Sequence, residues 1–187
     1  MRKLFIITTL LFSFSSFAQD VSTKEPDFVG EGFVLTEANG VVPLEKNKVN
    51  IETRMKFSAV GLNMVVNGCC SNVSLKPGTI KLVIKVENNA ISPSSSLEVF
   101  RLNSYTKNRS VEYMKLGNGG RVKEGTKMET LSFTASKYGT SSYLLTLTGV
   151  QEGEYGIALE SEKKSIGGGG LLNNVIGPTS ILTFKVK

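Results

Sequence analysis

Two adjacent cysteines, Cys69 and Cys70, are the side chains of this 187-residue chain with the most distinctive chemistry. Neighbouring Cα atoms lie about 3.8 Å apart, below the usual disulfide range of about 4.4–6.8 Å. Three interpretations stay open: a strained local disulfide that stiffens a loop, two buried thiols, and a bridge to another chain or a metal-linked role. A local bridge would close almost no loop and would therefore add little to global stability.

Missing residue types exclude several kinds of site. The chain has no His and no Trp, and its only aspartates are Asp20 and Asp27. Without His, neither a Ser-His-Asp nor a Cys-His catalytic arrangement can form. Imidazole zinc sites and an EF-hand calcium loop lack their ligands, and two cysteines cannot build a four-thiolate site. We therefore expect no metal and no cofactor.

Glutamates are the remaining candidates for acid–base chemistry. Sixteen residues are acidic and two of them are aspartates, which leaves fourteen glutamates. A glycosidase needs two carboxylates on either side of its substrate. No spacing in the sequence singles out such a pair, so a glutamate-dependent hydrolase is the alternative interpretation and a non-enzymatic role is favoured.

The N-terminus has the pattern of a secretory signal peptide. Two positive charges in residues 1–3 precede an apolar run from Leu4 to Phe14, and Ser16 and Ala18 provide the small residues of a cleavage site. The apolar run is shorter than the roughly 20 residues of a membrane-spanning helix. We expect cleavage after Ala18 and export of residues 19–187 to the periplasm, the cell surface or the medium, with no transmembrane span in the mature chain.

Charge is scattered along the chain. The net charge is +6, and Lys163-Lys164 is the only adjacent basic pair after the signal peptide. Nucleic-acid binding requires a clustered basic stripe, so no nucleic-acid partner is expected.

Alternation of apolar and polar residues dominates the mature chain and predicts half-buried strands. The clearest stretches are Val49–Phe57, Ile80–Val86, Leu131–Ala135, Tyr143–Leu147, Tyr155–Leu159 and Leu182–Val186. Four less regular stretches are Phe28–Leu35, Val41–Leu44, Leu97–Leu102 and Val111–Leu116. No mature segment has a helical apolar stripe, and no helix longer than about three turns is expected. Many short strands without helices predict one antiparallel β-sandwich domain over residues 19–187, immunoglobulin-like or related.

Two apolar segments adjoin residues typical of loops. Val60–Val66 leads into Asn67-Gly68, and Leu171–Ile176 follows four glycines. The favoured interpretation is that both are strands of the sandwich. If they are loops, they expose apolar surface that a partner would cover. The candidate binding residues on that alternative are Leu62, Met64, Val65, Cys69, Cys70, Leu171 and Leu172.

The segment from Ser142 to Leu159 forms a strand, a turn ending in Gly and a second strand opening with Gly-x-Tyr. This pattern is similar to extracellular β-sandwich modules of adhesins and envelope proteins. Together with Glu98–Leu102, Lys137-Tyr138-Gly139 and the signal peptide, the chain resembles secreted β-sandwich proteins of Bacteroidetes. The resemblance implies a fold and a compartment and carries no known active site. In such a module Tyr155 would bury its ring and use its hydroxyl to cap a loop, as in a tyrosine corner.

These observations favour a non-enzymatic, exported β-sandwich that acts in binding or assembly at the bacterial envelope. Its contacts would be made by sheet edges or loops. A protein partner is favoured over a glycan, because the chain lacks the Trp that glycan sites commonly use for stacking. A purely structural envelope component is a third alternative.

Overall fold

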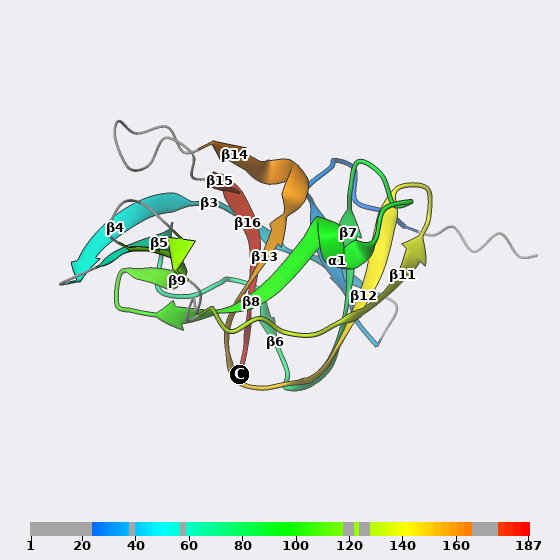
Figure 1. The fold of residues 1–187 in the computed structure, drawn as a ribbon. Coiled ribbons are helices and arrows are strands. Elements are labelled where there is room, and N and C mark those ends of the chain that lie inside the picture. Colours follow the sequence, from blue (N-terminus) through cyan, green and yellow to red (C-terminus); the bar gives the residue numbers. More distant parts are fainter. Residues whose placement is uncertain (1–23, 38–39, 57–58, 118–121, 124–127, 166–175) are drawn as a thin grey trace, which may run out of the picture.

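The structure is a computed structural model, which describes residues 24–187 except 38–39, 57–58, 118–121, 124–127 and 166–175. The predicted signal peptide, residues 1–18, lies outside the described residues. The described chain is mostly antiparallel β, in two sheets that pack on one another in a sandwich-like arrangement (Figure 1). The prediction of an all-β fold is therefore confirmed at the level of its class.

The smaller sheet has five strands in the order β11-β12-β7-β1-β2. Every pair in it is antiparallel. Its strands are β1 (Gly32–Leu35), β2 (Val41–Pro43), β7 (Gly78–Lys85), β11 (Thr134–Tyr138) and β12 (Ser142–Val150). Its face toward the other sheet carries alternate residues of β7 and β12, which are the apolar positions that the sequence pattern marks.

The larger sheet has the order β3-β16-β13-β8-β9-β5-β4, with β10 beside β9 and β6 parallel to β16. Strands β3 and β4 lie at the two opposite edges of this sheet, yet only Val49 separates them in the chain. The two edges are therefore close together at this point, and the sheet curls into a half-barrel. Its strands are β3 (Glu45–Lys48), β4 (Asn50–Lys56), β5 (Ala59–Asn67), β6 (Ser74–Leu75), β8 (Leu97–Ser104), β9 (Asn108–Gly117), β10 (Val122–Lys123), β13 (Gly153–Leu159) and β16 (Ser180–Val186).

Three short elements complete the described chain. Strands β14 (Lys163–Ser165) and β15 (Ile176–Pro178) pair with each other. A one-turn helix, α1 (Pro93–Ser96), precedes β8, and a 3-10 turn (Glu160–Glu162) follows β13. No longer helix occurs in the described residues, in agreement with the absence of a helical stripe in the sequence.

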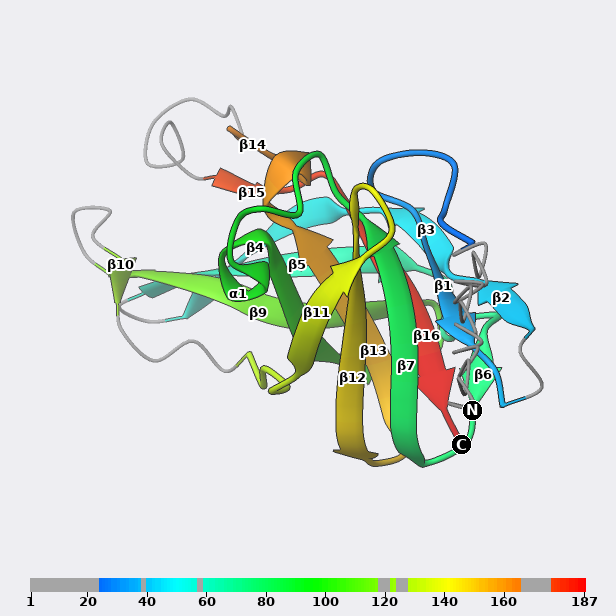
Figure 2. The same cartoon turned by 90° about the vertical axis from the view of Figure 1, so that its right-hand side faces the viewer.

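Two hydrophobic cores share a common layer, which consists of β8, β13 and β16. The first core lies between this layer and the five-stranded sheet and includes Val99, Tyr155 and Phe184. The second core lies inside the half-barrel, between the opposite face of the layer and strands β5 and β9, and includes Phe100, Ala158 and Ile181. Figure 2 shows strands β4, β5 and β9 extending away from the five-stranded sheet.

Burial on both faces explains the sequences of the central strands. All residues of β13 after Gly153 are buried, and in β16 only Lys185 is not. A strand covered on both sides has a nearly continuous apolar sequence instead of a strict alternation. The polar exceptions in these strands, Glu154, Ser180 and Thr183, therefore require partners inside the protein.

Tyr155 has the predicted arrangement. Its ring stacks on Phe184 with ring centroids 5.3 Å apart. Its hydroxyl donates a 2.7 Å hydrogen bond to the carbonyl oxygen of Gln151, four residues upstream in the preceding turn. The ring thus belongs to the first core and the hydroxyl fixes the β12–β13 turn.

Candidate functional site

Leu62, Met64 and Val65 do not lie in an exposed loop. They belong to β5, which pairs with β4 on one side and β9 on the other, and their exposed fractions are 0%, 1% and 4%. The strand interpretation is correct for this segment, and the expectation that it is a contact loop is wrong. Apolar side chains at alternate positions of β5 are needed to fill the half-barrel. Leu171 and Leu172 lie outside the described residues.

Cys69 and Cys70 lie in the turn that follows β5 and are joined by a disulfide across Cα atoms 3.8 Å apart. Both residues are exposed. Of the three interpretations of the sequence, the structure has the local bridge, and neither cysteine is buried. A disulfide of this kind presents a compact, polarisable sulfur surface to the solvent.

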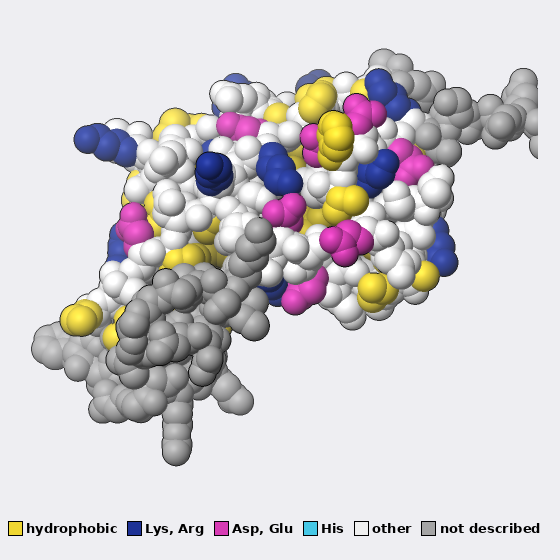
Figure 3. All heavy atoms as spheres, turned by 90° about the horizontal axis from the view of Figure 1, so that it is seen from above, with side chains coloured by type: hydrophobic (Ala, Val, Ile, Leu, Met, Phe, Trp, Pro, Cys, Tyr) yellow, Lys and Arg dark blue, Asp and Glu magenta, His cyan; other side chains and the backbone are white. Residues whose placement is uncertain are grey.

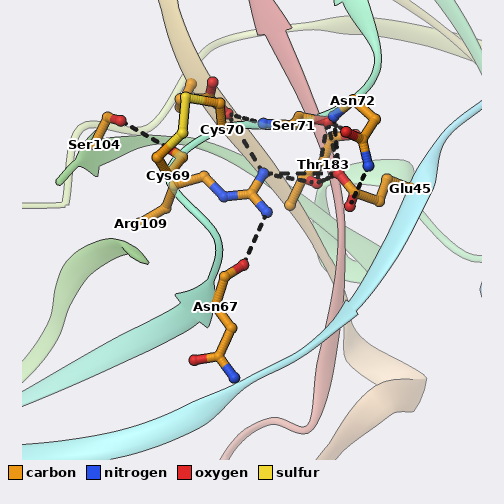
Figure 4. Close-up of a disulfide and its surroundings, with 10 residues drawn as sticks. Glu45, Asn67, Cys69, Cys70, Ser71, Asn72, Ser104, Arg109 and Thr183 are labelled. Carbon is orange, nitrogen blue, oxygen red and sulfur yellow. Dashed lines mark hydrogen bonds and ion pairs between the residues drawn. A yellow bond between two sulfur atoms is a disulfide. The ribbon is translucent and has the colours of Figure 1, made fainter. Parts of the chain in front are cut away.

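The disulfide turn is held against the neighbouring β8–β9 turn (Figure 4). The hydroxyl of Ser104 donates a 2.7 Å hydrogen bond to the carbonyl oxygen of Cys69. The backbone N–H of Gly68 donates a 3.0 Å hydrogen bond to the carbonyl oxygen of Lys107. Gly68 has a φ of +86°, a left-handed conformation that favours glycine. The exposed ring of Tyr105 stands in the same β8–β9 turn.

A buried group of polar side chains lies beneath the turn; we call it the Arg109 cluster. It consists of Arg109 from β9, Glu154 from β13, Thr183 from β16, Glu45 from β3 and Ser71. Only 1% of the Arg109 side chain is exposed. Its Nη1 lies 3.4 Å from a carboxylate oxygen of Glu154, 3.2 Å from the hydroxyl of Thr183 and 3.9 Å from an oxygen of Glu45.

The Arg109 cluster ties the disulfide turn to the half-barrel. The N–H of Ser71, next to Cys70, donates a 2.9 Å hydrogen bond to Glu154, and its hydroxyl donates one of 2.9 Å to Glu45. The Nη2 of Arg109 reaches the carbonyl of Asn67, on the other side of the cysteines, at 3.5 Å. Both ends of the turn are thus attached to the same buried charges (Figure 4).

The cluster also sets the ionisation of Glu45. Burial by itself would raise the pKa of this carboxyl group. Hydrogen bonds from Ser71 and Asn72 and the charge of Arg109 outweigh that effect, so the pKa is lowered from 4.5. The Glu45 carboxylate, which lies near the Arg109 guanidinium, therefore stays charged under mildly acidic conditions.

We expect the stability of the protein to fall in acid partly through Glu45. Because its pKa is lower in the folded state, the stabilisation is fully present above the unfolded value near 4.5 and is lost as the pH falls through the folded value. Urea unfolding at about pH 6 and about pH 3 should show a smaller loss for Glu45→Gln than for the wild type. Equal losses in both proteins would contradict a role for this carboxylate.

Sequence reasoning missed the Arg109 cluster, although a signal is present. Arg109, Val111 and Tyr113 occupy alternate positions of β9, and Val111 is part of the second core. Arginine in register with core residues indicates a buried charge that needs acidic partners. The sequence does not show which acidic residues these are, because Glu45 and Glu154 come from strands far away in the chain.

A second feature is a hollow of about 380 Å³ at the opposite end of the half-barrel from the Arg109 cluster. It is lined by α1, the start of β8, the segment from Thr130 to Phe133, and Glu160 and Lys163. Glu98 pairs with Ala158 across β8 and β13, whereas Glu154 pairs with Leu102. The two pairs are four residue steps apart along β13, or roughly 13 Å at the usual rise of a strand.

The described residues contain no group of three His, Cys, Asp or Glu side chains placed to hold a metal ion. Within the same part of the chain, no helix is long and apolar enough to cross a membrane. Comparisons with protein-family models, curated proteins and solved structures found no match for this chain. The site must therefore be interpreted from its own geometry.

Proposed function

We propose that this protein is an exported, non-enzymatic β-sandwich that binds another envelope or extracellular protein through the disulfide turn. The observation that carries the proposal is the exposed Cys69–Cys70 disulfide, held at both ends by a buried ion-paired cluster. Disulfides persist in oxidising compartments, which supports export. The signal-peptide pattern of residues 1–18 supports it independently.

A preorganised turn is suited to binding because little conformational entropy remains to be lost on association. The disulfide surface lies beside Tyr105, of which 49% is exposed, and tyrosine is enriched at binding hot spots. Lys and Arg side chains stand beside Asp and Glu on the face seen in Figure 3, with apolar side chains in small groups. That face therefore carries no uniform charge that would attract a polyanion non-specifically.

An immunoglobulin-like relationship is part of the proposal. Two packed antiparallel sheets and the hydroxyl of Tyr155 bonded to the backbone of the preceding turn both occur in such domains. The half-barrel curl of the larger sheet is a feature that this chain adds to a simple sandwich.

A glutamate-dependent glycosidase is the second candidate, because Glu98 and Glu160 line the same hollow. Glu160 is already engaged with Lys163 at 2.8 Å, which ties it to a neighbouring side chain. Incubation with nitrophenyl glycosides tests this alternative directly: release of nitrophenol that Glu98→Gln abolishes would establish it.

Replacement of both cysteines by serine should separate binding from folding. The bridge closes almost no loop, so we expect the melting temperature to change by no more than about 2 °C. We expect partner binding to weaken at least about tenfold, because the turn loses its fixed shape and its sulfur surface. A benzophenone amino acid at position 105 should crosslink the partner in envelope preparations, and the same probe at Thr148, exposed on β12 of the five-stranded sheet, should not.

Two outcomes would contradict this proposal. Equal crosslinking from positions 105 and 148 would show that the disulfide turn is not a specific contact. Unchanged binding of the identified partner by the Cys69→Ser/Cys70→Ser variant would show that the disulfide makes no contribution.

A further inference from the structure

The hollow beside α1 combines three kinds of side chain. Hydroxyl groups come from Ser94, Ser95, Ser96 and Thr130, charged groups from Glu98, Glu160 and Lys163, and apolar surface from residues that include Leu131 and Phe133. Its volume of about 380 Å³ falls within the range of about 300–1,000 Å³ that is usual for small-molecule sites.

The hollow forms where the segment from Glu129 to Leu131 stops running beside β8. Backbone bonds join Arg101 to Glu129 and Leu131 to Val99, with N–O distances of 2.9 and 2.8 Å. Beyond Leu131 the chain continues to β11 in the other sheet, so the first residues of β8, which pair with β13 along one edge, have no described strand along their other edge. The hollow is therefore bounded by α1, the start of β8 and the irregular segment from Thr130 to Phe133.

Glu98 is the unusual member of this site. Its side chain is half-buried, yet its carboxylate accepts no hydrogen bond and makes no ion pair with any described residue. The nearby charges are those of Lys163 and Glu160, which are paired with each other. The phenol of Tyr113 also lies close: burial raises its pKa, Lys163 lowers it, and Glu98 and Glu160 raise it further. A carboxylate in this position is a ready acceptor for donors of a ligand.

We propose that this hollow binds a neutral saccharide, with Glu98 accepting hydrogen bonds from sugar hydroxyl groups. The serine and threonine hydroxyls both donate and accept, and so match a ligand whose own groups do the same. Lys163 can donate to ring or hydroxyl oxygens, and Leu131 and Phe133 can cover the apolar face of a sugar ring. The proposal is independent of the protein contact at the disulfide turn.

A simple organic cation fits the same lining less well. Its ammonium group could pair with Glu98, but it would face the charge of Lys163 across the hollow. It would also make no use of the hydroxyl groups of Ser95 and Thr130 as acceptors and donors together, whereas those of Ser94 and Ser96 already contact Ser92. A saccharide matches the carboxylate, the ammonium group and the hydroxyls together.

Ligand-observed NMR on the intact, oxidised chain tests the proposal with cellobiose, maltose and N,N′-diacetylchitobiose as probes. We expect saturable binding of at least one disaccharide. Glu98→Gln, which keeps the shape of the side chain, should weaken that binding at least about tenfold, because hydrogen bonds to a charged group contribute more than neutral ones. Thr130→Val, at an exposed position, should weaken it a few-fold without affecting folding.

Glu52→Gln is the matched control, since Glu52 is exposed on β4 and does not line the hollow. The control should bind the disaccharide as the wild type does. Absence of binding for all three disaccharides, unchanged binding by Glu98→Gln, or tighter binding of butylammonium than of any disaccharide would overturn the proposal. The cysteine variant should retain saccharide binding, which distinguishes failure of this site from failure of the disulfide contact.

Discussion

Replacement of Arg109 by alanine is expected to lower the free energy of unfolding by about 3–5 kcal/mol. Removal of the guanidinium leaves the carboxylate of Glu154, only 8% exposed, without its cationic partner. It also removes the donor to Thr183 and to the carbonyl of Asn67. An uncompensated buried charge is among the few single changes that destabilise a domain this strongly. Urea unfolding followed by circular dichroism measures the effect.

Arg54→Ala is the matched control, because Arg54 is exposed on the edge strand β4. Its effect should stay within about 0.5 kcal/mol. A second variant, Arg109→Met with Glu154→Leu, removes both members of the buried pair and should be less destabilising than Arg109→Ala alone, since it leaves no orphaned charge on Glu154. A loss below about 1 kcal/mol for Arg109→Ala would contradict the structural role of the cluster.

Much of the fold could be predicted from the sequence, because alternating apolar and polar residues place the apolar side chains on one face of a strand. In β7 and β12, apolar residues two apart face a core, and these strands appear where the pattern predicts them. Strand β4 also appears where the pattern predicts it, but only Ile51 packs against a core and Met55 is 90% exposed. Short polar strands such as β3, with the sequence Glu-Lys-Asn-Lys, carry no such pattern. They form because the half-barrel supplies a partner edge, here β16, and tertiary context of this kind is absent from local sequence.

The candidate site could be predicted only in part. Adjacent cysteines behind a signal-peptide pattern single out this turn, but the sequence leaves a local bridge, two buried thiols and a bridge to another chain or a metal-linked role open. The apolar run Val60–Val66 is ambiguous, because a strand inside a half-barrel and an exposed contact loop can have the same composition. Whether Leu62 is covered depends on strands β4 and β9, and pairings of that kind are long-range. The hollow around Glu98 likewise requires three distant segments to meet.

The shared layer of β8, β13 and β16 is tightly packed on its half-barrel face. Phe100 has no exposed surface and lies over Gly156 of the paired strand β13. A Cβ atom added to Gly156 would come within 2.8 Å of Cε2 of Phe100 and 3.1 Å of Cδ1 of Ile181. Glycine at this position is therefore explained by the close approach of the Phe100 ring, and Gly156→Ala alone should cost about 1–3 kcal/mol by overpacking.

Phe100→Ala should in turn cost about 3–5 kcal/mol in the free energy of unfolding, because it leaves a cavity between the central layer and strands β5 and β9. Phe28→Ala is the matched control: that ring is 69% exposed, and its removal should change stability by less than about 0.5 kcal/mol. The double variant Phe100→Leu/Gly156→Ala should be more stable than the sum of its single changes predicts, since the smaller side chain makes room for the new methyl group. Strict additivity in urea unfolding, or a small loss for Phe100→Ala, would mean that the second core is loosely packed. In that case the half-barrel would not be the rigid support that joins the disulfide turn at one end to the Glu98 hollow at the other.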